Sequence, residues 1–184
     1  MEAIAAILTL ANIALVVRRS VWNFPVALVA VTLTALVLWR SRLYSDAGLQ
    51  GFFFVLNLYG WWAWRGKIAE AGSVVVERLT ARVLALWFAG SAAAMLAWGA
   101  FMAWQTDASL PWLDAAVAML SVAGQILLVR RKLENWYWWI AVNLISIGLY
   151  AVKELYWFTA LYVVLLALAV RGLIEWRNSE RGIL

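Results

Sequence analysis

Residues 112–132 read WLDAAVAMLSVAGQILLVRRK, a largely apolar run that ends in three consecutive basic side chains. A helix rises about 1.5 Å per residue, so a run of this length crosses most of the ~30 Å hydrocarbon core of a bilayer. Basic residues directly after an apolar run are typical of the cytoplasmic side of a membrane-spanning helix. This stretch therefore predicts a transmembrane helix whose C-terminal end faces the cytoplasm.

The whole chain shares the apolar character of this stretch. Of its 184 residues, 66% are hydrophobic and only 14% are charged, and the mean hydropathy is +0.84. Soluble domains are about half apolar and a quarter charged, so most side chains here must lie within a bilayer. The sequence has no Cys and no His, which excludes thiolate chemistry and removes the commonest metal ligand and general base. We therefore predict no metal, no cofactor and no catalytic centre.

Six further apolar runs predict a single transmembrane domain over residues 1–184 with seven spanning helices. The first run is interrupted by Asn12, and it lacks the basic leading region and cleavage pattern of a signal peptide. Pro25 and Pro111 lie near the starts of spans, where proline removes no needed helical donor. The predicted spans are 3–17, 24–39, 47–64, 83–104, 112–129, 136–152 and 156–174.

The basic residues divide unequally between the two sets of loops. Twelve of the fifteen follow the first, third, fifth and seventh spans, and the other three are Arg40, Arg42 and Lys153. The positive-inside rule then places the N-terminus outside and the C-terminus in the cytoplasm, which requires an odd number of spans. This distribution also explains the net charge of +5, so no nucleic-acid partner is predicted.

Residues 1–65 and 113–177 match one another at a displacement of 112. The matched residues are Val17, Arg18-Arg19, Asn23, Leu43-Tyr44, Leu49, Gly60 and Trp64-Arg65 with Val129, Arg130-Arg131, Asn135, Leu155-Tyr156, Leu161, Gly172 and Trp176-Arg177. These matches predict two copies of a three-helix unit joined by a connector helix at 78–104. Three spans plus one connector give both copies the same orientation, as in SWEET transporters. The architecture predicts transport, with a substrate site near the membrane midplane between the repeats.

Neutral polar and aromatic side chains line one face of the third and of the sixth predicted span. Their spacings of three, four and seven residues place them on a single helical face. Amides supply hydrogen-bond donors and acceptors, and indoles supply flat apolar faces. Two such faces suit a ligand with a flat ring and a sugar. The candidate substrate-binding residues are Gln50, Asn57, Trp61, Asn135, Trp136, Trp139, Asn143 and Tyr150.

Simpler interpretations compete with this one at single residues. Tryptophan and tyrosine near span ends also form interfacial belts, and Asn and Gln also bond neighbouring helices. We favour the helix-bonding role for Asn12 and Gln125, and a ligand role for the deeper Gln50, Asn57, Trp139 and Asn143. Asp46, Asp114, Glu134, Glu154 and Glu175 all lie near span ends. Ionisable groups at membrane depth mark ion-coupled sites, so their absence predicts transport without proton coupling.

The same residues resemble the PnuC family of bacterial vitamin transporters. The resemblance rests on Leu43-Tyr44, Leu49-Gln50, NLYGWWAW at 57–64, Glu134-Asn135-Trp136, Trp139, VNLIS at 142–146, Leu155-Tyr156, Gly172 and Trp176. It covers nearly the whole chain. It implies an all-α membrane protein of seven helices, with two parallel three-helix repeats and a connector, similar to an enlarged SWEET.

The resemblance also implies a function. It implies facilitated uptake of a B-vitamin across the bacterial inner membrane, with nicotinamide riboside first and thiamine or riboflavin as alternatives, since many relatives have Asp in place of Asn143. It further implies a homotrimer and a functional link to a cytoplasmic vitamin kinase that traps the product. A SWEET-type sugar carrier would have a Pro-Gln pair in each repeat, which is missing here. A membrane-embedded enzyme would need a catalytic group at membrane depth, and a purely structural subunit would not need aligned polar faces.

Overall fold

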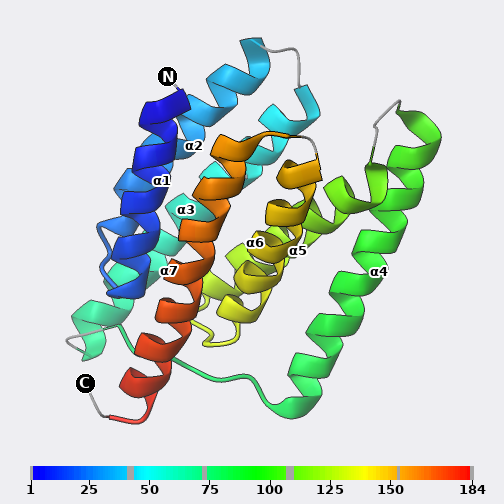
Figure 1. The fold of residues 1–184 in the computed structure, drawn as a ribbon. Helices are drawn as coiled ribbons and strands as arrows, with labels where there is room; N and C mark the ends of the chain where they lie inside the picture. The colour runs from blue at the N-terminus through cyan, green and yellow to red at the C-terminus, as the bar shows by residue number, and fades with distance from the viewer. Residues whose placement is uncertain (1, 41–43, 72–73, 107–109, 153, 183–184) are drawn as a thin grey trace.

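The computed structural model describes residues 2–40, 44–71, 74–106, 110–152 and 154–182 and folds them into seven helices (Figure 1). The helices are α1 (Glu2–Val17), α2 (Asn23–Arg40), α3 (Tyr44–Ala71), α4 (Ala81–Gln105), α5 (Pro111–Val129), α6 (Asn135–Val152) and α7 (Tyr156–Glu180). The seven predicted spans are thus confirmed as helices. Arg42, Leu43 and Lys153, used in the predictions above, lie outside the described residues.

The helix ends differ from the predicted spans mainly in α3 and α7. Both run beyond the predicted ends at Trp64 and Ile174, because good helix formers with charged side chains continue the helix beyond the apolar part. Helix α4 begins at Ala81, one residue after Thr80, whose side-chain oxygen accepts a hydrogen bond from the Val83 N–H at 3.4 Å. Residues 78–80 of the predicted connector are therefore not helical.

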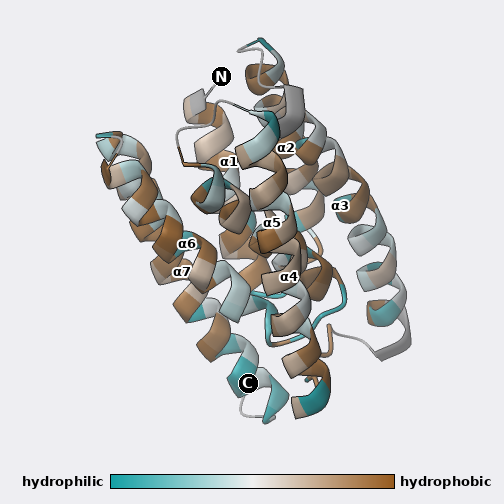
Figure 2. Ribbon diagram, turned by 90° about the vertical axis from the view of Figure 1, so that its right-hand side faces the viewer, coloured by the Kyte–Doolittle hydropathy of each residue, from teal (hydrophilic) through white to brown (hydrophobic). Residues whose placement is uncertain are grey.

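Within the described residues, four helices are long and apolar enough to cross a bilayer: α2, α4, α5 and α7, with α1 as a shorter apolar helix. The two remaining helices, α3 and α6, are those that contain the predicted substrate-binding residues. Figure 2 shows hydrophobic residues along the helices and hydrophilic ones gathered toward the end where the C-terminus lies. We call this end, where α1, α3, α5 and α7 finish, the basic end.

Six helices close a ring, and α4 lies outside it. Helix α1 packs on α2, α2 on α3, α3 on α5, α5 on α6, α6 on α7, and α7 back on α1, while α4 packs on α5. Helices α1–α3 and α5–α7 therefore meet at two places, α3 with α5 and α1 with α7. Figure 1 shows α4 at the edge of the molecule, and much of it is exposed, as expected of a helix that faces lipid.

The ends of α1 and α5 have the same unusual cap. Arg19 and Arg131, which are 112 residues apart, both adopt a left-handed backbone with φ of 57° and 58°. The four capping bonds are Arg19 N–H to Val16 O (2.9 Å), Ser20 N–H to Leu15 O (3.0 Å), Arg131 N–H to Leu128 O (2.8 Å) and Lys132 N–H to Leu127 O (2.9 Å). This is the Schellman pattern, which satisfies helix carbonyls that lipid cannot.

Two tryptophans join the two groups of helices near the basic end. The Trp64 Nε1–H of α3 donates to the Val129 carbonyl of α5 at 3.1 Å, and the Trp176 Nε1–H of α7 donates to the Val16 carbonyl of α1 at 3.0 Å. Both indoles are fully buried, with ring centroids 6.0 Å apart. The matched pair Trp64 and Trp176 therefore makes the same contact twice, once at each junction of the ring.

Matched glycines allow close packing within each group. A Cβ on Gly60 would lie 2.4 Å from Phe24 Cε1, and a Cβ on Gly172 would lie 2.3 Å from Trp136 Cζ2. Only glycine fits at either position, because a real Cβ never approaches a neighbour so closely. The repeat boundaries 1–65 and 113–177 stay a prediction, and these recurring contacts support it.

Candidate functional site

Two amides meet between α3 and α5 inside the helix bundle. The Gln125 Nε2–H donates to Asn57 Oδ1 at 3.3 Å, and the Asn57 Nδ2–H donates to the Phe53 carbonyl one turn earlier at 2.8 Å. Asn57 and Gln125 are buried, with 4% and 8% exposure. A buried amide without a partner would be costly in a bilayer, so this bond fixes the orientation of both side chains.

The Trp139 indole lies against the neighbouring residue of α5. A Cβ on Gly124 would lie 3.3 Å from Trp139 Cε2 and 3.4 Å from its Nε1. The indole Nε1–H is buried and has no hydrogen-bond partner among the described residues. Gly124 and Gln125 thus bring a free indole donor of α6 and the amide of Asn57 in α3 to one turn of α5.

Further along α6, the side chains of Asn143 and Ser146 are buried, with 5% and 0% exposure. Tyr150, another turn on, stacks against both Phe158 and Tyr162 of α7, with centroid separations of 5.2 and 5.3 Å. The predicted face of α6 therefore contacts α5 at its start and α7 near its end. Trp139 lies near α5 and Tyr150 lies near α7.

The structure places Asn135 and Trp136 at the basic end, in the packed core. The Asn135 Nδ2–H donates to the Lys132 carbonyl at 2.6 Å, and the matched Asn23 makes the same bond to Ser20 at 2.6 Å. Trp136 packs edge-on against Trp176 at 5.5 Å. Asn135 Oδ1 and Trp136 Nε1 are buried without a partner among the described residues. These two residues support the helix packing, and their role in binding stays a prediction.

The two remaining candidates lie on α3 at different depths. Gln50 and Trp61 are half-buried, and Trp61 packs against the buried core at the basic end. Of the eight predicted residues, Asn57 and Trp139 are the pair that α5 brings together. Their link is through Gln125, whose predicted helix-bonding role is confirmed by its bond to Asn57, and through Gly124, for which no role was predicted. The sequence signal for these two residues was a Gly-Gln pair within an apolar span, since a small residue and an amide together suit contact with polar neighbouring helices.

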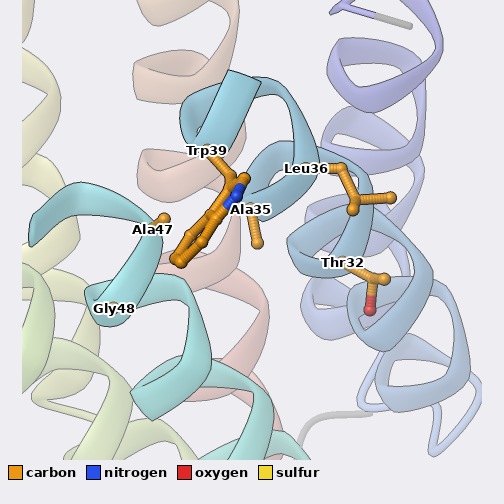
Figure 3. Close-up of a pocket in the computed structure, with 6 residues that line it drawn as sticks. All are labelled: Thr32, Ala35, Leu36, Trp39, Ala47 and Gly48. Carbon is orange, nitrogen blue, oxygen red and sulfur yellow. The ribbon is translucent and has the colours of Figure 1, made fainter. Parts of the chain in front are cut away.

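Two pockets among the described residues lie away from these candidates. One of about 310 Å³ lies between α2 and α3, where the Trp39 ring points toward Ala47 and Gly48 (Figure 3). The other, of about 400 Å³, lies between α4 and α5. Neither is lined by a candidate residue, and among the described residues no cluster of Asp or Glu suits a metal ion.

Comparisons with known proteins cover nearly the whole chain. Residues 1–178 match the family described as nicotinamide mononucleotide transporter. The chain is 28% identical to the nicotinamide riboside transporter PnuC of Escherichia coli over 205 residues, covering 98% of this chain and 86% of that protein. It is 27% identical to the riboflavin/roseoflavin transporter RibM of Streptomyces davaonensis over 198 residues, covering 100% of this chain and 89% of that protein.

A solved structure shares the fold. The crystal structure of the vitamin B3 transporter PnuC matches with a TM-score of 0.79 at 26% identity, covering 98% of this chain and 82% of that one. This match confirms the predicted fold class, and the family match confirms the predicted resemblance. The chain therefore belongs to the nicotinamide mononucleotide transporter family and is a multi-pass membrane transporter, not an enzyme.

Proposed function

We propose that the protein is a facilitator for uptake of a B-vitamin, with nicotinamide riboside as its substrate. The observation that carries the proposal is the arrangement around α5, where Gln125 bonds the amide of Asn57 in α3 and the adjacent Gly124 lies against the Trp139 indole of α6. Amides bond a carboxamide or a ribose, and an indole stacks on a flat ring and attracts its positive charge. The PnuC relatives named as nicotinamide riboside transporters support this choice.

A direct test measures uptake of labelled nicotinamide riboside by proteoliposomes that contain the purified protein. We expect saturable uptake that unlabelled nicotinamide riboside abolishes and that thiamine leaves unchanged. Protein-free liposomes are the control. Uptake no faster than in protein-free liposomes would contradict the proposed substrate.

Replacement of Trp139 should weaken substrate binding most. Stacking on an aromatic side chain is worth about 1–3 kcal/mol, so Trp139→Ala should raise the Kd roughly five- to hundredfold. Trp139→Phe keeps a ring without the N–H donor and should give a smaller increase. Isothermal titration of the purified variants checks this result.

The matched control is Trp157→Ala, since Trp157 is 90% exposed and its loss should leave the Kd unchanged. Asn143→Ala tests the deeper part of the α6 face. Wild-type affinity in both Trp139→Ala and Asn143→Ala would contradict this placement of the site.

A second candidate substrate is riboflavin. The similarity to RibM over the full chain favours it, and an isoalloxazine ring also needs an aromatic surface and amide partners. Competition decides between the two: a larger reduction of labelled uptake by riboflavin than by an equal concentration of nicotinamide riboside would make riboflavin the substrate.

The proposed orientation places the N-terminus outside and the basic end in the cytoplasm. It rests on the twelve basic residues that follow the odd-numbered spans, against three elsewhere. A reporter fused at the C-terminus that fluoresces only in the cytoplasm should be active, and one that requires export should be silent. The opposite pattern would reverse the orientation. The homotrimer and the link to a vitamin kinase also stay proposals, and native mass spectrometry tests the first.

A further inference from the structure

A short extended segment crosses the basic end of the ring. Residues 74–79, which we call the strap, run from α3 toward α4 (Figure 1). Glu77 forms a parallel bridge with Lys132 in the α5–α6 loop. Its N–H donates to the Arg131 carbonyl at 3.0 Å, and its carbonyl accepts from the Leu133 N–H at 2.9 Å. The segment that follows the last helix of the first repeat is thus bonded to the second repeat.

Charge strengthens this attachment. The Glu77 carboxylate accepts hydrogen bonds from Arg131 Nη2 at 2.8 Å and from Lys132 Nζ at 2.6 Å. The bond from Lys132 first, and then that from Arg131, hold the pKa of the Glu77 carboxyl below its usual value. Two residues further along, the Leu79 N–H donates to the Glu134 carboxylate at 3.1 Å. The strap is therefore held at two points of the same loop.

The strap also contributes to the apolar core at this end. Val74 and Val76 are 4% and 7% exposed, and they pack in one cluster with residues from all six ring helices. The cluster is Val16, Val17, Phe24, Trp64, Val74, Val76, Leu128, Val129, Leu133, Trp136, Ala169 and Trp176. The strap and the two buried tryptophans therefore close the basic end together.

We propose that the strap is the gate at the basic end, and that Glu77 is its latch on Arg131 and Lys132. The strap follows α3 and is bonded to the α5–α6 loop, so the two repeats separate at this end only when the strap leaves that loop. Lifting it also removes Val74 and Val76 from the core over Trp64 and Trp176. This inference rests on the proposed transport function, because only a transporter needs this end to open.

A disulfide across the bridge tests whether the strap must move. The chain has no Cys, so a double variant Glu77→Cys, Lys132→Cys contains only the new pair. Paired extended segments lie about 4.8 Å apart, within the roughly 4.4–6.8 Å that a disulfide spans between Cα atoms. Oxidation should lower the initial rate of nicotinamide riboside uptake at least about tenfold, and a reductant should restore it.

The controls separate the gate from the transport function. The double-serine variant Glu77→Ser, Lys132→Ser loses the same charges and should respond neither to oxidant nor to reductant. Mass spectrometry reports the cross-link, and its failure to form would contradict the bridge and the gate. Unchanged uptake in the cross-linked protein would also overturn the gate. A lack of uptake by the unmodified chain would instead overturn the proposed function.

A labelling experiment tests the latch separately. A single cysteine at Val76 should react slowly with a water-soluble maleimide, because this side chain of the strap is buried in the core. Adding Glu77→Gln should raise the labelling rate at least about threefold, since the strap opens more often. Glu175→Gln, which removes an ion pair with Arg171 elsewhere at this end, is the matched control. Equal rates in the two backgrounds would show that Glu77 is no latch.

Discussion

Gly172→Leu should strongly destabilise the folded protein. A Cβ at this position would lie 2.3 Å from Trp136 Cζ2 and 2.4 Å from its Cη2. Trp136 is 1% exposed and packs edge-on against Trp176, so its ring has no free space to enter. Overpacking of this kind costs about 3 kcal/mol or more, which lowers the Tm of a protein of this size by roughly 10 °C.

Size-exclusion chromatography and thermal unfolding of the detergent-purified variant check this expectation. The matched control is Gly148→Leu in α6, where nothing lies within 4 Å of the added Cβ. Its Tm should stay within a few degrees of the wild-type value, as is usual for surface substitutions that cost about 0.5 kcal/mol or less. An equal loss in both variants would show that the contact between Gly172 and Trp136 is not what limits this position.

Vitamin uptake should stop at equilibrium unless a kinase removes the product. The candidate residues around α5 are neutral amides and indoles, and ion-driven carriers usually have an ionisable group at membrane depth. Empty proteoliposomes should therefore fill with nicotinamide riboside to the external concentration and no further. Vesicles loaded with a nicotinamide riboside kinase and ATP should accumulate labelled product well beyond that concentration.

An imposed gradient provides the control for this experiment. A proton or sodium gradient across kinase-free vesicles should change the rate and the final level of uptake by less than the scatter between preparations. Accumulation driven by either gradient would overturn uncoupled transport. The search for the coupling group would then begin at Glu154 and at Asp46, whose side chain lies outside the described residues.

The fold could be predicted from the sequence because its main determinants are local or repeated. Hydrophobic runs of bilayer length decide where helices form, and their polar ends decide where they stop. The residues that recur at a displacement of 112 have recurring structural roles: Trp64 and Trp176 bond the neighbouring repeat, and Gly60 and Gly172 each accept a ring from the preceding helix. A residue needed twice for packing leaves a visible repeat in the sequence.

The candidate site could be predicted only in part, because it depends on which helices meet. Helical periodicity placed Asn57 on a polar face of α3 and Trp139 on a polar face of α6. It contained no information that α5 would lie between them, although it did predict the helix-bonding role of Gln125, which the bond to Asn57 confirms. The contacts of the strap were harder still to predict from the sequence. An extended segment of six residues, 74–79, has no helical periodicity, and its partners in the chain are more than fifty residues away.

The residues that break the internal repeat have an evolutionary consequence. At a displacement of 112, Asn57 corresponds to Ala169, Trp139 to Ala27, and Gln125 to Ile13. A symmetric pair of identical three-helix chains would place each of these residues twice, and the second copies of Trp139 and Asn57 would then replace alanines that are almost fully buried in α2 and α7. A single polypeptide frees each half from that constraint. Fusion of two ancestral half-length genes would thus have permitted the asymmetric arrangement of the candidate site, which no homodimer of such halves can form.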